Sequence, residues 1–364
     1  MNKLKVAFVG CGLIAVEYVE VYCSLPWVRL AVCIDVDESL AQRTAERCSV
    51  LTGDRPQVSS AFEDALAPEI DVVVINTPND LHRPQALAAI AAGKHVLLQK
   101  PLAANLADAQ LIAEAARNAK STIGMYMSYL DHPVLHDLRD LVRTGFYGDA
   151  VEFYGRTMHP KGMMWSREAL LGKCSWRNSV QRTGGGCFIQ LAVHYIRLAQ
   201  WILGARIVEV QAYTANLHSP GLEGEDLGMA WLRTEADTQI VLSTAWCATG
   251  DQLSITGTKG ATDYLYNKTL NLKPQSDFAY KGRAIDFVSK ADETVSFDVA
   301  APRLGETGNA LNQHRRFLEA VRDGRPVDVT VNEALQDMKV LAACYESAVS
   351  HAAVRVVAPA LVTV

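Results

Sequence analysis

Two polar side chains stand out in an apolar segment that follows three glycines. The stretch GGGCFIQLAVH covers residues 184–194, and its polar side chains are Gln190 and His194. Residues four apart lie on one face of an α-helix, one turn from each other. The spacing therefore predicts a helix with both side chains on one face. Imidazole exchanges protons near neutral pH, so His194 is a candidate for chemistry. The alternative is an ordinary core histidine.

Lys100 ends the largely apolar run KHVLLQK (94–100) and precedes Pro101. A strand that is apolar at nearly every position is buried on both faces, so Lys100 is expected at the end of a buried strand. An ammonium group there stabilises negative charge that develops on a reacting oxygen. Together with a base such as His194, it suits the oxidation of an alcohol, which loses a proton to the base and a hydride to a cofactor.

A glycine motif indicates which cofactor that is. GCGLIA (10–15) fits G-x-G-x-x-[G/A] and lies between an apolar strand and a helix. Such a turn lets the backbone approach a pyrophosphate, whose charge meets the free N–H groups of the helix N-terminus. The position at the start of a βαβ unit makes the motif specific for a dinucleotide.

Asp35 ends the second expected strand, 20 residues after Ala15. A carboxylate there accepts hydrogen bonds from a ribose diol and repels a 2′-phosphate. No arginine follows, since the next residues are Val36, Asp37 and Glu38. The sequence therefore predicts NAD rather than NADP. The alternative is that Asp35 only caps the next helix.

Two further motifs end strands at the same edge of this sheet, where ligands bind. They are NTPNDLH (76–82) and LQKPL (98–102). With GCGLIA before them and GGG…H after them, they resemble the glucose–fructose oxidoreductase / inositol dehydrogenase / MocA (Gfo/Idh/MocA) family. The resemblance extends over essentially the whole chain, including 145–153 and 317–348.

The resemblance implies hydride transfer between a nicotinamide cofactor and a hydroxyl-bearing carbon of a sugar or cyclitol. It matches Lys100 to the family's E-K-P lysine and His194 to its catalytic histidine. For His82, a helix-capping role and a substrate contact both stay open. The expected cofactor site comprises Gly10, Gly12, Leu13, Ile14, Asp35, Asn76, Thr77, Pro78, Asn79, His82, Gln99 and Lys100.

Two acids of the family are amides in this chain. Gln99 replaces the glutamate of E-K-P, and Gln190 replaces the aspartate four residues before the histidine. An amide keeps hydrogen-bonding capacity but loses the charge. We therefore expect Lys100 and His194 to titrate lower than in the family, which makes His194 a neutral base at pH 7.

A basic stretch precedes the glycines. It has six cations against one acid, an excess of five in a chain of net charge -5: Arg156, Lys161, Arg167, Lys173, Arg177 and Arg182 against Glu168. One interpretation is an anionic substrate, such as a nucleotide-sugar, sugar phosphate or uronate. The other is a solvated or subunit-contact surface. The expected substrate contacts are Gln190, Arg177, Trp176, His159 and Arg197. Trp165 and Trp176 suit either sugar stacking or core packing, and Gly184–Gly186 are expected to bring the chain close to substrate.

The elements that must position these residues fall into two domains. Over residues 1–124, apolar strands alternate with helices, which predicts an α/β Rossmann domain with a doubly wound parallel sheet. Expected strands are 5–10, 28–36, 71–77, 94–100 and 122–127, and expected helices are 13–25, 38–48, 83–93 and 105–119.

Residues 125–364 are expected to form an α+β domain for substrate binding and oligomerisation. Period-two runs predict a large, mostly antiparallel open sheet. Expected strands are 150–159, 207–217, 227–234, 238–248 and 252–258, and expected helices are 133–144, 309–322 and 333–350. The run IVLSTAWCA (240–248) is apolar at nearly every position, so both faces of its strand need cover. We expect two such sheets to pack together in a homodimer or homotetramer.

Composition excludes several classes of protein. The net charge of -5 argues against nucleic-acid binding. No apolar run reaches about 18 residues, so no membrane partner is expected, and the lack of an export signal favours the cytoplasm. The eight cysteines form no Cys-x-x-Cys pair or zinc spacing, so reduced thiols and no metal are expected.

Three functions fit these residues. The leading one is an NAD-dependent dehydrogenase of a sugar, cyclitol or derivative, anionic ones included. The second is a redox-neutral enzyme of the same family that oxidises a sugar transiently while cleaving or modifying it. The third is a non-catalytic sugar- or NAD-sensing regulator, against which the presence of both Lys100 and His194 argues.

Overall fold

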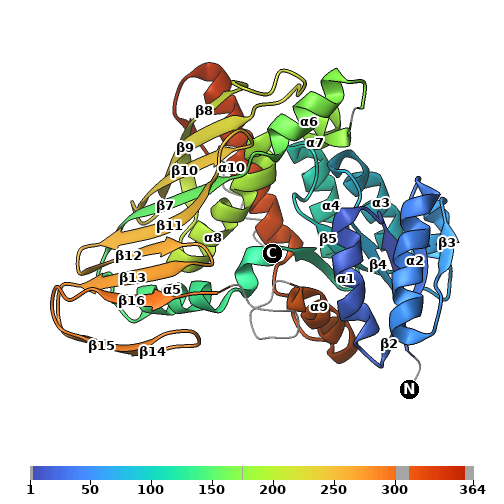
Figure 1. Ribbon diagram of the computed structural model, residues 1–364, viewed down its shortest axis with the longest axis horizontal. Coiled ribbons are helices and arrows are strands. Elements are labelled where there is room, and N and C mark those ends of the chain that lie inside the picture. Colours follow the sequence, from blue (N-terminus) through green and yellow to red (C-terminus); the bar gives the residue numbers. More distant parts are fainter. Residues whose placement is uncertain (1–2, 174, 301–310, 357–364) are drawn as a thin grey trace. The chain divides into compact units, whose positions relative to one another are not determined.

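The computed structural model describes residues 3–173, 175–300 and 311–356 (Figure 1). The chain divides into two compact units. Met1–Ser128 and Ala310–Leu335 form the first unit, and Tyr129–Asn309 and Gln336–Val364 form the second. Among the described residues, no helix has both the length and the hydropathy needed to cross a bilayer.

A six-stranded, fully parallel sheet forms the centre of the first unit, as the sequence predicts. Its strand order is β3-β2-β1-β4-β5-β6. The strands are β1 (Leu4–Val9), β2 (Val28–Ile34), β3 (Gln57–Ser59), β4 (Val72–Ile75), β5 (His95–Gln99) and β6 (Ile123–Tyr126). Val6, Phe8 and Val72 are fully buried, which explains why these segments read as continuous apolar runs.

Helices connect these strands in two packed groups. Helix α1 packs beside α2 and α9, and α3 packs beside α4. Their bounds are α1 (Leu13–Cys23), α2 (Glu38–Thr52), α3 (Asn79–Ala91), α4 (Leu106–Asn118) and α9 (Asn312–Asp323), with a short 3-10 turn at Phe62–Leu66. This arrangement brings the loops after β1, β2, β4 and β5 to one edge of the sheet.

Helix α9 joins the first unit, although it falls within 125–364, the range expected to form the second domain. The reason is an aromatic contact that spans most of the chain. The ring of His314 lies 4.1 Å from that of Tyr18 and 4.5 Å from that of Tyr126, and its Nδ1 is 2.8 Å from the Tyr22 hydroxyl. Complete burial lowers the pKa of His314 to about 3, so this ring packs as a neutral group.

The second unit contains a nine-stranded sheet of order β16-β13-β12-β11-β7-β10-β9-β8-β17. Every pair is antiparallel except β7 with β10, so the prediction of a mostly antiparallel sheet is confirmed. The strands are β7 (Ala150–Met158), β8 (Ile207–Ala215), β9 (Leu227–Thr234), β10 (Gln239–Ala245), β11 (Gly250–Gly257), β12 (Gly260–Leu265), β13 (Thr269–Pro274), β16 (Val295–Asp298) and β17 (Val354–Arg355). A separate hairpin joins β14 (Phe278–Lys281) to β15 (Asp286–Ser289).

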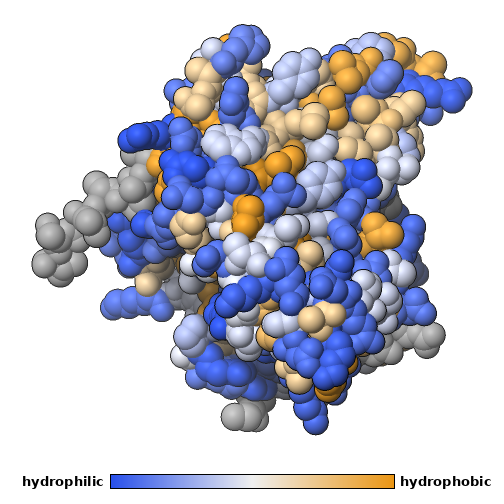
Figure 2. All heavy atoms as spheres, turned by 90° about the vertical axis from the view of Figure 1, so that its left-hand side faces the viewer, coloured by the Kyte–Doolittle hydropathy of each residue, from blue (hydrophilic) through white to orange (hydrophobic). Residues whose placement is uncertain are grey.

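Helices cover one face of this sheet. Helix α8 packs on α5 and β7, and the π-helical turn before it packs on β9 and β10. The bounds are α5 (Pro133–Arg143), α6 (Lys161–Leu170), α7 (Val180–Thr183), the π turn (Phe188–Ala192), α8 (Val193–Leu203) and α10 (Val331–Ser350), with 3-10 turns at Ser128–Asp131 and Trp176–Asn178. On β9, Ala230 and Leu232 are buried, whereas Met229 on the opposite face is 44% exposed. Figure 1 shows no helix over that opposite face, and Figure 2 views it directly.

Candidate active site

The glycine turn after β1 is built for close backbone approach. Gly10 has a φ of +88°, and a Cβ added to it would lie 2.7 Å from the carbonyl carbon of Asn76. Only glycine fits this position, because the left-handed conformation and the neighbouring strand end both exclude a side chain. A Cβ on Gly12 would meet no atom within 4 Å, so the space in front of this residue is open.

Helix α1 starts at Gly12 without a side-chain cap. The first N–H groups of a helix have no partner within the helix. An uncapped start beside open space therefore fits the pyrophosphate of a dinucleotide. The predicted cofactor residues Leu13 and Ile14 begin this helix, and their side chains lie outside the described part of the structure.

Asp35 follows β2 and holds the glycine turn. Its Oδ2 accepts a hydrogen bond of 2.7 Å from the main-chain N–H of Cys11, and its Oδ1 accepts one of 3.0 Å from that of Asp37. The N-cap of α2 is Asp37, which accepts from the N–H of Ser39 at 3.1 Å. The alternative role of Asp35 as helix cap is therefore excluded, and its carboxylate lies beside the turn.

The loop after β4 lies next to this turn. The N–H of Asn76 donates to the carbonyl of Val9 at 2.7 Å. The Nδ2 of Asn76 is buried and has no hydrogen-bond partner in the described structure. An orphaned buried donor beside the glycine turn fits a bound polar ligand. Thr77 donates to Gln85 at 2.6 Å, Pro78 is the N-cap of α3, and Asn79 begins that helix.

His82 joins two loops at this sheet edge. Its Nδ1 lies 2.9 Å from the carbonyl of Pro101, and its Nε2 lies 3.0 Å from the carbonyl of Thr77. The ring is fully buried, and burial lowers its pKa. The sequence leaves two roles open for His82, helix capping and substrate contact. In the structure, both ring nitrogens of His82 lie within hydrogen-bond distance of main-chain carbonyls.

Gln99 and Lys100 follow β5 at the same edge. The Oε1 of Gln99 accepts from the N–H of Lys100 at 2.9 Å, and its Nε2 donates to the Tyr18 hydroxyl at 3.0 Å. The amide at the family's acid position thus uses both its acceptor and its donor to hold this loop. Lys100 is joined to Pro101 by a cis peptide bond.

In the second unit, the glycines before the predicted helix approach other protein segments. A Cβ on Gly185 would lie 2.1 Å from the Tyr345 hydroxyl, and one on Gly186 would lie 2.0 Å from the carbonyl oxygen of Glu225. Gly185 and Gly186 thus make room for Tyr345 and Glu225. The expectation that Gly184–Gly186 bring the chain close to substrate stays a prediction.

The helix that carries Gln190 and His194 is not a regular α-helix. Gln190 lies in the π turn, and His194 lies in the first turn of α8. Both side chains are 7% exposed. Single π turns inside helices occur frequently at functional sites. The His194 ring lies 4.7 Å from the ring of Tyr129.

Glu225 and Tyr345, which lie on other segments, accept hydrogen bonds from main-chain N–H groups of the π turn. The N–H of Phe188 donates to Glu225 Oε1 at 2.9 Å, and the N–H of Ile189 donates to the Tyr345 hydroxyl at 3.1 Å. That hydroxyl donates to Glu225 Oε1 at 2.8 Å. Burial raises the pKa of Glu225. Sequence reasoning missed Glu225, Tyr345 and Tyr129, because no motif marks them and each acts from a distant segment.

Arg197 has a structural partner. Its Nη2 donates to Asp337 at 2.7 Å and its Nε at 2.9 Å, with side chains only 6% and 1% exposed. Gln200 donates to the same carboxylate at 2.9 Å. Removing one partner of a buried ion pair leaves an uncompensated charge, so this pair must stay intact. Arg197 therefore has a structural role in this pair, and the expectation that it contacts substrate stays a prediction.

Arg177 differs from the other cations of its stretch. Its guanidinium lies 4.3 Å from the Trp176 ring and 5.0 Å from the Trp165 ring. Burial lowers its pKa to about 10. No carboxylate pairs with it among the described residues. His159 stacks on Trp246 nearby in this unit, with ring centroids 6.4 Å apart and an interplanar angle of 28°. By contrast, Lys161, Arg167 and Lys173 are exposed.

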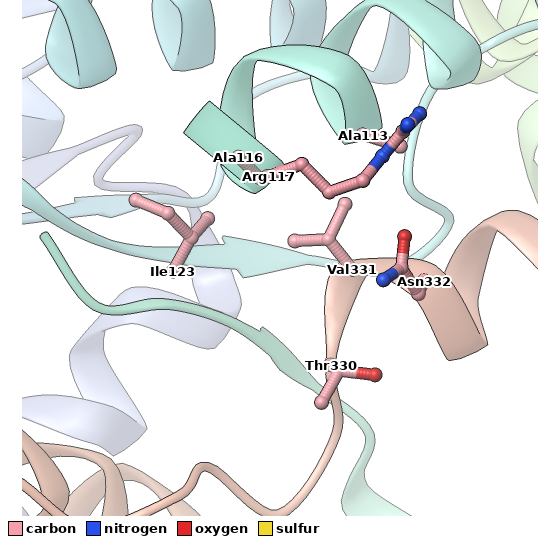
Figure 3. A pocket seen from close by; sticks show the side chains of 7 residues that line it. All are labelled: Ala113, Ala116, Arg117, Ile123, Thr330, Val331 and Asn332. Atoms are coloured by element: carbon pink, nitrogen blue, oxygen red, sulfur yellow. The ribbon is translucent and has the colours of Figure 1, made fainter. Parts of the chain in front are cut away.

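A small pocket of the first unit lies at the sheet edge opposite the glycine turn and Lys100 (Figure 3). Figure 3 shows Arg117 of α4 extending over Val331 and Asn332 at the start of α10. Ile123, which also lines it, begins β6, so the pocket is at the amino edge of the sheet rather than the carboxyl edge. Glu333 already accepts from Thr330 at this helix start. In the described ranges, no cluster of three or more His, Cys, Asp or Glu has metal-binding geometry.

Comparison with known proteins now identifies the family. A model described as an oxidoreductase family with an NAD-binding Rossmann fold matches residues 4–127. A model of the GFO/IDH/MocA C-terminal domain matches residues 135–263. Together they cover more than half of the chain. The chain belongs to the GFO/IDH/MocA family. This confirms the predicted family, the NAD-binding Rossmann domain and the oxidoreductase class.

Individual relatives differ in activity. The chain is 30% identical over 230 residues to a 1,5-anhydro-D-fructose reductase of Ensifer adhaerens, covering 61% of this chain and 66% of that protein. It is 27% identical over 184 residues to an alpha-N-acetylgalactosaminidase of Shewanella oneidensis, covering 49% and 39%. The matched segments thus span less than two thirds of either relative. A levoglucosan dehydrogenase solved with NADH and L-sorbose is 22% identical with a TM-score of 0.82, covering 99% and 100% of the two chains.

Proposed function

We propose that this protein is an NAD-dependent dehydrogenase that oxidises or reduces a ring carbon of a sugar, cyclitol or sugar derivative. The observation that carries the proposal is the position of Lys100. It follows β5 at the same sheet edge as the uncapped start of α1 and the Asp35 carboxylate. A cation at that edge meets the reacting end of a dinucleotide whose pyrophosphate lies on α1.

NAD, when bound, accepts the hydride from the substrate carbon or returns it. The ammonium group of Lys100 holds the substrate oxygen and stabilises the negative charge that develops there. His194 takes the proton of the hydroxyl during oxidation and gives it back during reduction. Gln190 orients the substrate through its amide, without the charge that the family's aspartate supplies.

We further propose that the substrate carries a carboxylate or phosphate, which Arg177 binds. A half-buried guanidinium without a carboxylate partner retains donors for an anion. The rings of Trp176 and Trp165 lie within cation–π distance of this guanidinium and favour its position. The exposed Lys161, Arg167 and Lys173 fit the alternative of a solvated surface, so the proposal rests on Arg177.

Absorbance of NADH tests both statements. NAD is mixed with neutral polyols, inositols and aldoses in one set and with uronates, sugar phosphates and nucleotide-sugars in another. We expect NADH to form, with higher kcat/KM for the anionic set, and we expect Arg177→Gln to remove that preference. If no member of either set gives NADH, the proposed dehydrogenase activity is contradicted.

A second candidate is a glycoside-cleaving enzyme with transient oxidation, which the similarity to an alpha-N-acetylgalactosaminidase favours. Such an enzyme returns the hydride to the same sugar. It would release the aglycone of a nitrophenyl glycoside without net NADH. The same mixtures, read for nitrophenol instead of NADH, separate the two candidates.

We also propose that the helix-free face of the nine-stranded sheet forms a subunit interface. Tyr213 on β8 pairs in register with Met229 on β9, and these side chains are 53% and 44% exposed. They share the face with Trp231 and Val241 of neighbouring strands. Apolar side chains gathered on an open sheet face favour burial against a second copy.

A further inference from the structure

Two thiols of the first unit lie side by side on neighbouring helices. Cys23 is the last residue of α1, and Cys48 lies near the end of α2. Their Sγ atoms are 3.4 Å apart. A disulfide has an Sγ–Sγ distance of about 2.05 Å, so the sulfurs must approach by roughly 1.4 Å to join.

Access distinguishes this pair from the other cysteines. Cys23 is half-buried and Cys48 is 3% exposed, so the pair is reached from the Cys23 side. Cys11 and Cys33 also share a thiol hydrogen bond, but both are fully buried. Cys247 is half-buried, and its thiol donates to the carbonyl of Asp226 at 3.6 Å. Within the described residues, Cys23 and Cys48 alone combine a thiol partner with access from solvent.

The hydrogen bond between the two thiols also prepares them for reaction. It lowers the pKa of Cys48 to about 7, while burial acts in the opposite direction. The same hydrogen bond, followed by burial, raises the pKa of Cys23. Near neutral pH, one of the two thiols is therefore ionised to a thiolate in a substantial fraction of the molecules. The thiolate is the form of cysteine that attacks a disulfide.

We propose that Cys23 and Cys48 form an oxidative modification site that reacts with small disulfides such as oxidised glutathione to give an intramolecular disulfide. In the first step the proton of Cys23 moves along the hydrogen bond to Cys48. This transfer runs against the order of the two pKa values, but it places the thiolate on Cys23, the sulfur that is reached from solvent. Cys23 Sγ then attacks one sulfur of glutathione disulfide. A Cys23–glutathione bond forms, the glutathione S–S bond breaks, and one glutathione thiolate leaves.

In the second step Cys48 loses that proton to solvent and attacks Cys23 Sγ. The Cys23–glutathione bond breaks, the Sγ–Sγ bond forms, and the second glutathione thiolate leaves. The two cysteines are oxidised by two electrons, and one glutathione disulfide is reduced to two thiolates. The product links the ends of α1 and α2, the two helices that begin at the glycine turn and after Asp35.

Peptide mass spectrometry of the full chain tests this site. The reduced protein is incubated with excess oxidised glutathione at neutral pH, alkylated with iodoacetamide and digested without reductant. We expect a peptide in which Cys23 is linked to Cys48, and we expect dithiothreitol to abolish it. If the wild-type protein yields no such peptide, the proposal is overturned without recourse to any variant.

Single substitutions test the order of attack. Cys48→Ser removes the second nucleophile and also the hydrogen bond that raises the pKa of Cys23, so Cys23 should lose its proton without Cys48 and remain as a stable glutathione adduct. Cys23→Ser leaves only the buried thiol, so Cys48 should be alkylated after unfolding and carry no glutathione. Cys247→Ser is the matched control, half-buried like Cys23, and should form the disulfide at the wild-type yield. A glutathione adduct on Cys48 but not on Cys23 would contradict the mechanism. Thermal unfolding curves verify that each variant is folded.

Discussion

At the scale of single residues, two amides, Gln99 and Gln190, stand where the resemblance to the family implies acids. The structure shows what the first amide does. Gln99 accepts from the N–H of Lys100 and donates to Tyr18, so it holds the lysine's loop without adding a charge. The carboxylate that does remain, Asp35, accepts two main-chain hydrogen bonds beside the glycine turn.

Replacing Asp35 should change the choice of cofactor. We infer that the Asp35 carboxylate binds a ribose diol and repels a 2′-phosphate, and Asp35→Ser removes it. Because hydrogen bonds to charged groups contribute about 1.5–3 kcal/mol, we expect the NAD-to-NADP ratio of kcat/KM to fall by about tenfold to a hundredfold. Asp37→Ser is the matched control, since serine keeps the N-cap of α2 and should leave the ratio unchanged. An unchanged ratio in Asp35→Ser would refute the assignment.

Replacing Gln190 should shift the pH dependence of the reaction. Gln190→Asp restores a carboxylate one helical turn before His194, and a nearby negative charge favours the protonated imidazole. Oxidation needs the neutral form of the base, so the acidic limb of the kcat/KM profile should move to higher pH. Gln190→Asn keeps an amide and should leave the limb where it is in the wild type. A limb that does not move in Gln190→Asp would count against His194 as the base.

At the scale of elements, the π turn depends on groups that come from other parts of the chain. Glu225 and Tyr345 bind the N–H groups of Phe188 and Ile189 and are bound to each other. The i→i+5 hydrogen bonding of a π turn is rare and stable only where its surroundings support it. We therefore regard Glu225 and Tyr345 as positioning residues for Gln190 and His194.

Because the pKa of Glu225 is raised, the stability that Glu225 gives the fold around the π turn should depend on pH. A carboxyl group with a raised folded-state pKa stabilises the fold below its ordinary value of 4.5, and this contribution is lost as the pH rises through the folded value. Glu225→Gln does not titrate. The unfolding free energy of the wild type relative to the variant should thus fall as the pH rises from about 4.5 to neutrality, by about 1.4 kcal/mol for each unit of pKa elevation. Denaturant titrations across this range measure it.

The control for this titration is Glu223→Gln, two residues earlier on the same loop, whose carboxylate accepts from the N–H of Val180. The difference in unfolding free energy between the wild type and Glu223→Gln should not show the fall with pH that is expected for Glu225→Gln. If the difference in unfolding free energy between the wild type and Glu225→Gln does not change with pH, the buried carboxyl group does not titrate in this range.

At the scale of the whole molecule, residues at the ends of buried strands are predictable from the sequence, whereas features built by distant segments are not. Gly10, Asp35 and Lys100 are predictable because each lies at the end of an apolar run. The place of α9 depends on the contact between Tyr22 and His314, which are 292 positions apart. The π turn depends on contacts that span 37 and 156 positions, and no local pattern signals either. The ion pair of Arg197 with Asp337, 140 positions away, is likewise not signalled by any local pattern.

The proposed subunit interface can be tested with two matched substitutions. Met229 on the open sheet face and Leu111 on α4 are each 44% exposed. A lysine buried in an apolar interface is costly, so Met229→Lys should shift the protein toward monomer, whereas Leu111→Lys should not. Light scattering coupled to size-exclusion chromatography measures the mass. A wild-type monomer at micromolar concentration would contradict the interface.

The central claim, a dehydrogenase site built on Lys100 beside an NAD-binding turn, is tested most directly by Lys100→Met. Methionine keeps the length of the side chain and removes its charge. With the best substrate of the panel, we expect kcat/KM to fall by about 10²–10³-fold, the usual cost of losing one electrostatic stabiliser. NAD affinity, measured by calorimetry, should change little because the glycine turn and Asp35 are intact. Wild-type turnover in Lys100→Met with unchanged NAD binding would contradict the account.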